Sequence, residues 1–504
     1  MNSVPTSSHN RGDLRIKFGH IPALLFLTTL AFAVQGYHPG VEDAEIYNPA
    51  ILKILNPSLY PFGAEFFQSH ARLTMYPNLI ATTARVFHSS AGPALIFWQL
   101  LSIFLLLLAC WTLACELFEN PSARWAGLGL VAALLTIPIA GTGLYLMDEY
   151  VNPRAIALFL AVFMIADTLK KKYAGVALWA LLSAVVHPLM TLFSLSLVLV
   201  IICLRKFDGY LGHRNLAMAL SFSPLGLSFS YPSQAYRTFL QTRPYFFILR
   251  WQWYEWLGIF LPLGVLWWFS RLARKNRMTS LELICRALII YGFVYFLFAL
   301  VITIPPRLLA LDRYQPMRSL QLLYALLFLI IGGLLGEWVL RGRWWAWMLL
   351  FAPLCAGMVW TQGEIFPSTP HIEWPGTVPA NDWLQAFAWI RTNTPVTATF
   401  ALNPNHMALP GEDAHGFRAL AERSMLADAI KDSGAVTMFP ELPLAEHLQQ
   451  QLRSEDGWEH FQTSDFIRLH EQWGVTWFVL DQPGAIGLEC PYQNKTLRVC
   501  HLPS

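Results

Sequence analysis

The chain has 504 residues, of which 55% are hydrophobic and only 13% are charged. Soluble globular proteins carry about 25% charged residues, so this composition excludes an ordinary soluble protein and indicates one that crosses a membrane several times. The net charge of +3 is too small to indicate nucleic-acid binding, and the seven cysteines contain no CxxC pair of the zinc or redox type.

Apolar runs recur along the first two thirds of the chain, each close to the length that crosses ~30 Å of hydrocarbon. About eleven runs can be distinguished, and they cover residues 18–35, 92–115, 125–146, 155–169, 174–187, 189–204, 215–230, 255–270, 284–304, 319–339 and 344–361. The sequence therefore predicts an α-helical polytopic membrane protein whose transmembrane domain covers residues 1–361.

Basic residues predict how these runs are oriented, because loops rich in Lys and Arg stay in the cytoplasm. Arg11, Arg15 and Lys17 precede the first run, which places the N-terminus in the cytoplasm. The stretch 174–204 has basic residues at both ends and therefore forms a hairpin, with its turn at His187-Pro188 because proline interrupts a helix.

The same counting requires the weak run 215–230 to cross, which leaves the C-terminus outside the cytoplasm. We therefore expect an inner-membrane protein with an extracytoplasmic C-terminal domain. The sequence Ala31-Phe32-Ala33 resembles a signal-peptide cleavage site. We favour a retained first helix, since multi-pass proteins usually keep it, and removal would leave the orientation of the later runs unchanged.

After residue 361 the composition changes to that of a linker, 362–379, and then of a small soluble α/β domain, 380–504. Periodicity predicts helices at 381–391, 416–430 and 443–453 and strands at 397–402, 475–480 and 496–502. Cys490 and Cys500 lie in this domain, which the predicted orientation places in an oxidising compartment, and we expect them to form a disulfide.

The first outward loop, 37–90, begins with the carboxylates Glu42 and Asp43, close to the end of the first run. An apolar stripe over residues 46–59 then predicts a helix that lies in the membrane interface. Two interpretations of the carboxylates remain open. In the first interpretation, Glu42 or Asp43 is a catalytic base. In the second, Glu42 or Asp43 caps this helix while Glu45 completes a capping box.

Further polar residues lie in the later outward loops. Asp148 and Glu149 form a second acidic pair, and His187 lies at the hairpin turn, where it is either a ligand or a hydrogen-bonded structural residue. The fifth outward loop contains Arg307, Arg313 and Arg318. Their side chains either extend to lipid head groups or bind a phosphate with the guanidinium fork.

This layout resembles the GT-C superfamily of membrane glycosyltransferases, which includes oligosaccharyltransferases, protein mannosyltransferases and aminoarabinose transferases. Protein mannosyltransferases have an adjacent Asp-Glu pair in the first outward loop, where this chain has Glu42-Asp43 in the reverse order. Asp148-Glu149 occupies the loop of a second acidic motif, but without the Asp-x-Asp spacing. The stretches 389–395 and 416–424 also resemble uncharacterised bacterial members, whereas the oligosaccharyltransferase Trp-Trp-Asp motif is absent from the sequence.

The resemblance implies sugar transfer from a polyprenyl-phosphate donor at the outer face of the membrane. Asp43 or Glu42 would be the base, and Arg313 and Arg318, helped by Arg307 and His187, would hold the phosphate. Asp148 and Glu149 lie in the loop that corresponds to the one that helps to hold a divalent cation in oligosaccharyltransferases. The alternative is a non-catalytic carrier, scaffold or transporter of lipid-linked glycans, although few charged residues lie inside the runs, which disfavours ion-coupled transport.

Overall fold

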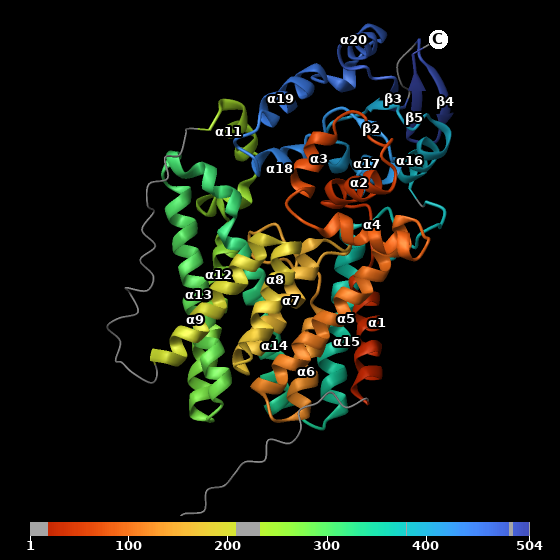
Figure 1. Ribbon diagram of the computed structural model, residues 1–504. Helices are drawn as coiled ribbons and strands as arrows, with labels where there is room; N and C mark the ends of the chain where they lie inside the picture. Colours follow the sequence, from red (N-terminus) through yellow and green to blue (C-terminus); the bar gives the residue numbers. More distant parts are fainter. Residues whose placement is uncertain (1–18, 208–231, 380, 483–486, 503–504) are drawn as a thin grey trace, which may run out of the picture.

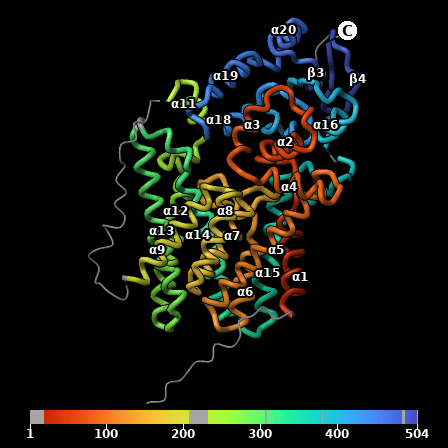
Figure 2. Tube along the Cα trace, viewed as in Figure 1, coloured from red at the N-terminus to blue at the C-terminus, as the bar shows by residue number. Residues whose placement is uncertain are grey.

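The computed structural model describes residues 19–207, 232–379, 381–482 and 487–502 of the chain. Long helices form a bundle, and a second region of shorter helices and a small sheet covers one end of it (Figure 1). Helices from the first loop, α2 to α4, lie at this same end beside the C-terminal elements (Figures 1 and 2). Segments that are far apart in the sequence therefore meet there.

Six helices within the described ranges are long and apolar enough to cross a membrane. They are α5 (Ala91–Leu117), α9 (Pro188–Phe207), α12 (Trp253–Lys275), α13 (Thr279–Thr303), α14 (Leu320–Leu335, within the apolar stretch Leu308–Leu340) and α15 (Trp344–Ile365). The shorter helices of the bundle are α1 (His20–Gln35), α6 (Pro121–Ala133), α7 (Pro153–Leu169) and α8 (Tyr173–Val186). A mostly helical, multi-pass membrane protein is thus confirmed, whereas eleven spans are not.

Two predicted spans differ from the expectation. The run 215–230 lies outside the described residues, as do the basic residues of the N-terminus. The run 125–146 is helical only as far as Ala133. Beyond it, Pro138 pairs with Tyr145 in an isolated bridge and Gly143 adopts a positive φ of 66°, so the chain folds into an irregular hairpin in place of a helix.

Helix α6 packs closely against α14 through small residues. A Cβ atom added to Gly332 of α14 would lie 2.5 Å from the carbonyl oxygen of Ala126, so no larger residue fits there. Close approach through small residues is a common way for membrane helices to associate. This packing holds α6 in place and so fixes the point from which the irregular segment after α6 begins.

The predicted hairpin turn is confirmed in position. Helix α8 ends at Val186 and α9 begins at Pro188, so His187 lies between the two helices. The first outward loop contains α2 (Ala44–Leu55), α3 (Ala64–Ala71) and α4 (Tyr76–Val86). The helix predicted from the apolar stripe exists as α2, but Ile46, Ala50 and Leu59 are buried against protein side chains. A position in the membrane interface was therefore wrong for this face.

The C-terminal region contains a five-stranded sheet of order β2-β1-β3-β5-β4. Strands β2, β1 and β3 run parallel, and β5 pairs antiparallel with β3 and β4. The strands are β1 (Thr399–Ala401), β2 (Ser424–Met425), β3 (Trp477–Asp481), β4 (Glu489–Gln493) and β5 (Leu497–His501). The helices are α16 (Asp382–Asn393), α17 (Phe417–Ala421), α18 (Lys431–Thr437), α19 (Leu444–Ser454) and α20 (Thr463–Trp473).

The predicted helix 416–430 is wrong beyond its first turns. Helix α17 ends at Ala421, and Glu422 takes a left-handed conformation with a φ of 55°. The chain then enters β2, because Ser424 and Met425 pair with the buried strand β1. Tertiary pairing thus overrides the helical pattern of the local sequence.

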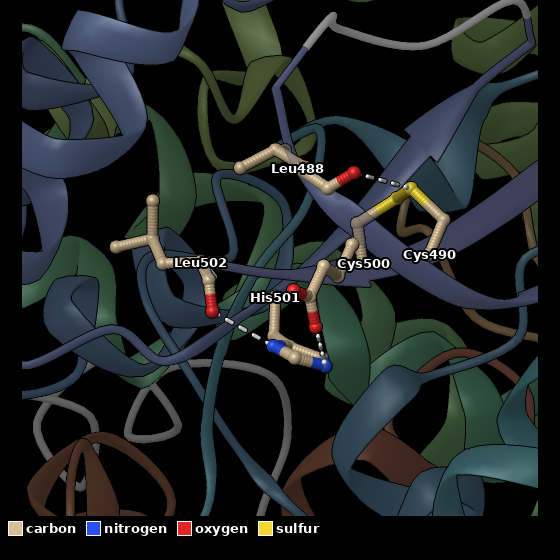
Figure 3. Close-up of a disulfide and its surroundings, with 6 residues drawn as sticks. Leu488, Cys490, Cys500, His501 and Leu502 are labelled. Carbon is tan, nitrogen blue, oxygen red and sulfur yellow. Dashed lines mark hydrogen bonds and ion pairs between the residues drawn. A yellow bond between two sulfur atoms is a disulfide. The ribbon is translucent and has the colours of Figure 1, made fainter. Parts of the chain in front are cut away.

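Shorter elements connect these helices and strands. They are α11 (Gln234–Gln241), η1 (Pro244–Phe246), η2 (Ile248–Arg250), η3 (Pro306–Tyr314), η4 (Pro316–Ser319), η5 (Gly336–Leu340), η6 (His406–Ala408) and η7 (Trp458–His460). Cys490 of β4 and Cys500 of β5 form a disulfide across the edge of the sheet (Figure 3). This bond fastens β4, a strand that the sequence did not predict, to the buried strand β5.

Candidate functional site

The irregular segment after α6 is held in place by three buried glutamines from different helices. Gln35 of α1 donates to the carbonyls of Met147 and Asp148 at 3.1 and 2.7 Å. Gln99 of α5 also donates to the Asp148 carbonyl at 3.1 Å, and Gln321 of α14 donates to the carbonyl of Leu146 at 3.0 Å. These bonds satisfy carbonyls that have no helical donors, and they fix the position of the second acidic pair.

Arg154, in the first turn of α7, connects the first and second outward loops. Its guanidinium donates to Asp43 Oδ2 at 2.8 Å and to Asp148 Oδ2 at 3.0 Å. Asn152 also donates to the same Asp148 oxygen at 2.5 Å. One buried cation is thus shared by a carboxylate from each loop, which explains how residues 111 positions apart are held together.

Asp43 does not cap α2, although it occupies the N-cap position, because its side chain makes no capping bond there. Its carboxylate instead contacts Arg154 and the ammonium of Lys431, which lies 3.5 Å from Oδ1. Burial opposes ionisation of this group, but Lys431 and Arg154 outweigh burial and hold the pKa of Asp43 well below its usual range. Asp43 is therefore ionised at physiological pH.

The capping box of the second interpretation is also absent, because Glu45 acts on a different helix. Its carboxylate accepts hydrogen bonds from the backbone N–H groups of Arg418 and Ala419, at 2.9 and 2.8 Å, in the first turn of α17. A carboxylate at a helix N-terminus is a favourable arrangement. Glu45 thus connects the first loop to the C-terminal region and takes no part in capping α2.

Glu42 is more exposed than Asp43 and has a different environment. Its side chain is 53% exposed and forms an ion pair with Lys431 of α18, a helix from the C-terminal region. Its backbone takes a positive φ of 52°, which turns the chain just before α2. Glu42 and Asp43 therefore share one cation, but only Asp43 also contacts Arg154.

Glu149 lies next to Asp148 but points into a different environment. It is 2% exposed, and its Oε1 atom has no hydrogen-bond partner among the described residues. Burial and the neighbouring Asp148 raise the pKa of Glu149 to about 8, so its carboxyl group is mostly protonated at neutral pH. Asp148 is thus paired with Arg154, whereas the adjacent Glu149 forms no ion pair among the described residues.

Arg318 precedes α14 at the same end of the bundle and is half-buried. Its guanidinium lies over the ring of Tyr245, 5.8 Å from the ring centre, but it forms no ion pair within the described part of the chain. Its Nε atom is buried and has no hydrogen-bond partner there. A guanidinium in this state is a good site for an anion.

The other two arginines of this loop differ from Arg318. Arg313 forms an ion pair with Glu441 at 2.9 Å and is partly exposed. The side chain of Arg307 lies outside the described residues. Gln315 separates η3 from η4 with a left-handed φ of 43°, and this turn lets Arg313 and Arg318 face one cavity, as the bend predicted at Pro316 required.

That cavity has a volume of about 480 Å³ and also contains His187 and His70 in its wall. His187 Nδ1 accepts a hydrogen bond from the backbone N–H of Met190, so its Nε2 atom carries the proton and can donate. His70 of α3 interacts with the Tyr47 hydroxyl at 3.1 Å, and burial lowers its pKa to about 4.

A second cavity of about 590 Å³ lies next to the first. Glu42, Asp148, Glu149 and Lys431 line only this second cavity. Asp43, Arg154, Arg318 and Tyr245 line both. The structure thus brings most of the predicted residues together and places Asp43 and Arg318 where the two cavities meet.

The carboxylates do not fit the divalent cation that the oligosaccharyltransferase resemblance implies. Arg154 already lies between Asp43 and Asp148, and Lys431 already contacts Glu42 and Asp43. Glu149, the remaining acid, is mostly protonated at neutral pH. Two cationic side chains thus occupy the positions that a metal would need.

Sequence reasoning missed Arg154, Lys431, His70 and Tyr245 as site residues. Arg154 had a usable signal, because it lies six residues after Asp148 in the same outward turn. Lys431 had none, since it is separated from Glu42 by 389 positions and belongs to a short helix of the C-terminal region.

Neither a protein-family model nor a curated protein matches this sequence. The Archaeoglobus fulgidus oligosaccharyltransferase, tethered with an acceptor peptide containing the NVT sequon, is 14% identical, with a TM-score of 0.48 over 92% of this chain and 69% of that one. The same enzyme, AglB, with an inhibitory peptide and a dolichol-phosphate is 12% identical, with a TM-score of 0.44 over 92% and 69%. The arabinofuranosyltransferase AftD from Mycobacteria is 13% identical, with a TM-score of 0.46 over 98% of this chain and 40% of that one.

These structures are GT-C glycosyltransferases, the superfamily whose layout the sequence resembles. Because the identities and TM-scores are low, we infer function from the site residues alone.

Proposed function

We propose that the chain is a membrane glycosyltransferase that moves a sugar from a polyprenyl-phosphate-linked donor to an acceptor hydroxyl at the outer face of the cytoplasmic membrane. The observation that carries this proposal is the half-buried guanidinium of Arg318, which has no ion-pair partner among the described residues and lies with Asp43 at the junction of two cavities. A cation and a carboxylate placed together are what transfer from a phosphate leaving group requires.

The cavity of about 480 Å³ fits the donor. Leu73, Leu189 and Leu192 line it beside the α8–α9 turn, and the side chains of Leu73 and Leu192 are exposed. A polyprenyl chain can therefore lie along apolar side chains while its phosphate reaches Arg318. The Nε2–H of His187 and the guanidinium of Arg313 are further donors to the phosphate oxygens from the same wall.

The cavity of about 590 Å³ fits the acceptor, because it is lined by charged and polar groups near the C-terminal region. In the proposed reaction the acceptor oxygen attacks the anomeric carbon, and the bond from that carbon to the phosphate oxygen breaks. The polyprenyl phosphate leaves with the electron pair, and Arg318 stabilises its negative charge. The acceptor proton passes to Asp43, whose Oδ1 has only the longer contact to Lys431.

The alternative function is binding or carriage of a lipid-linked glycan without chemistry. One observation favours it. Arg154 and Lys431 hold the pKa of Asp43 low, and a carboxylate with a low pKa is a weak base. Catalysis therefore requires that acceptor binding displace Lys431 from Asp43, which would raise the pKa of the carboxylate. A pure carrier would need Arg318 but not the charge of Asp43, so substitution of each residue separates the two functions.

The test of donor recognition compares two lipids that differ only in the phosphate. Native mass spectrometry of the purified full chain should show binding of a polyprenyl monophosphate, and much weaker binding of the corresponding polyprenol. Equal binding of the two lipids would contradict a phosphate site at Arg318. Binding of the phosphate lipid without any sugar transfer would favour the carrier.

A further inference from the structure

Three side chains from distant parts of the sequence converge outside the two cavities described above. They are His38 of the first outward loop, Glu373 of the segment after α15, and His415, which precedes α17. His38 Nδ1 lies 2.6 Å from Glu373 Oε1, and His415 Nε2 lies 3.0 Å from the same oxygen. Both histidine side chains are 0% exposed, and that of Glu373 is 14% exposed.

The hydrogen bonds of His415 direct a ring-nitrogen lone pair at the Glu373 carboxylate, and such a contact needs a positive charge between the two groups. Its Nδ1 atom lies 2.8 Å from the carbonyl oxygen of Glu412, and because a carbonyl only accepts, Nδ1 must carry the proton. Neutral His415 therefore turns the lone pair of Nε2 towards Glu373 Oε1, which is also an acceptor. Two acceptors at 3.0 Å require a cation between them, either an added proton or a metal ion.

The arrangement has the features of a metal ligand set. A histidine ligand usually donates its second ring N–H to a carbonyl or carboxylate, as His415 does to Glu412. The ring of His38 is held by stacking on Phe366, with ring centres 3.9 Å apart. Ligands at the ~2.0–2.1 Å zinc distance lie roughly 3.3 Å apart around a tetrahedral ion. The three donor atoms here all lie within 4.8 Å of one another, with separations of 2.6 and 3.0 Å from Glu373 Oε1, so small side-chain shifts would suffice to enclose an ion.

We propose that His38, Glu373 and His415 bind a divalent transition metal ion, of which zinc fits the donor set best. Two imidazole nitrogens and one carboxylate oxygen are ligands that zinc takes, with a fourth position left for water. Glu373 also lines a separate cavity of about 810 Å³, which gives the ion a route to the site. The site is distinct from Asp43 and Arg318 and does not rest on the proposed function.

The metal would fasten three chain segments that already meet through their backbones. The N–H of Glu373 donates to the carbonyl of Tyr37 at 2.9 Å, and the N–H of Gly416 donates to the carbonyl of Gly40 at 2.8 Å. The ion would thus stabilise the junction of the first loop, the linker and the C-terminal region. This junction lies just before Glu42 and Asp43 in the sequence.

The proposal is tested on the untagged full chain in detergent, first stripped with a chelator and then incubated with zinc. Elemental analysis after removal of free zinc should find an equimolar amount bound to the wild type and to His371→Ala. His371 is a nearby histidine whose ring instead contacts the Ala33 carbonyl, which makes it a matched control. Zinc should raise the melting temperature of both proteins.

Glu373→Gln keeps the size of the side chain but removes the charged ligand, so it should bind little zinc and show no rise in melting temperature. Wild-type protein without bound zinc and with an unchanged melting temperature would overturn the proposal and leave a protonated His415 as the bridging cation. Equal zinc binding by wild type and Glu373→Gln would overturn it as well. If the variant fails to fold, the wild-type measurement alone decides.

Discussion

Replacement of Arg318 by lysine tests the phosphate site without removal of a positive charge. Lysine keeps a long stem and an ammonium, but it loses the planar fork that binds two phosphate oxygens at once. Because Arg318 forms no ion pair among the described residues, the substitution breaks no ion pair that stabilises the fold, and a lysine ammonium can still lie near the Tyr245 ring. Any loss of lipid binding would therefore report on the ligand itself.

The magnitude follows from the loss of one charge-assisted hydrogen bond, about 1.5–3 kcal/mol, which corresponds to roughly 10- to 150-fold weaker binding. Native mass spectrometry with a polyprenyl monophosphate measures this change. Arg313→Lys should have a smaller effect, since Arg313 is partly exposed and already paired with Glu441. Arg250→Lys is the control, because Arg250 is an exposed arginine outside both cavities, and it should leave binding unchanged. Wild-type affinity in Arg318→Lys would refute the phosphate site.

Three further predictions concern topology, pH and the disulfide. Reporter fusions should indicate the cytoplasm after Lys172, Arg277 and Arg343 and the opposite side after Pro188, Met317 and Gly363; a cytoplasmic signal after Gly363 would contradict the orientation. The raised pKa of Glu149 means that the native state binds more protons than the unfolded state between about 4.5 and about 8, so stability should fall as pH rises through this window. Glu149→Gln should lessen that fall in thermal melting, and an unchanged profile would show that Glu149 is not the group responsible. Loss of the Cys490–Cys500 bond should cost about 2–4 kcal/mol of stability, seen as easier unfolding after reduction, whereas quantitative thiol labelling of the unreduced native protein would exclude the bond.

Local sequence patterns were sufficient for much of the fold. The break at His187-Pro188 was predictable because proline interrupts a helix, and α2 was predictable from the spacing of its apolar residues. The environment of α2 was not predictable, because the stripe that would suit a membrane interface is covered by the rest of the first loop. Periodicity reveals an apolar face but not whether lipid or protein covers it.

The site could be predicted only in part, for a similar reason. Asp43 and Arg318 were recognisable as charged residues beside membrane spans, where charge needs an explanation. Arg154 could be noticed beside Asp148, but its contact with Asp43, like that of Lys431, became visible only when α7 and α18 were placed against the first loop. The same contacts exclude Asp43 as the cap of α2, since its carboxylate faces cations and makes no capping bond, whereas its role as a base stays a proposal.

Sugar transfer by Asp43→Asn is the measurement that tests the central claim most directly. Asparagine keeps the size of the side chain and can still accept from Arg154, but it cannot take a proton from the acceptor. The control is Glu364→Gln. Glu364 is an exposed carboxylate that lines the cavity of about 590 Å³, as Asp43 does, but it contacts neither Arg154 nor Lys431. Glycan product is measured in cells that depend on the chain, at matched protein levels. We predict that Asp43→Asn abolishes the product but still binds the polyprenyl monophosphate, while Glu364→Gln behaves as wild type. Undiminished product from Asp43→Asn would contradict a catalytic base at this site.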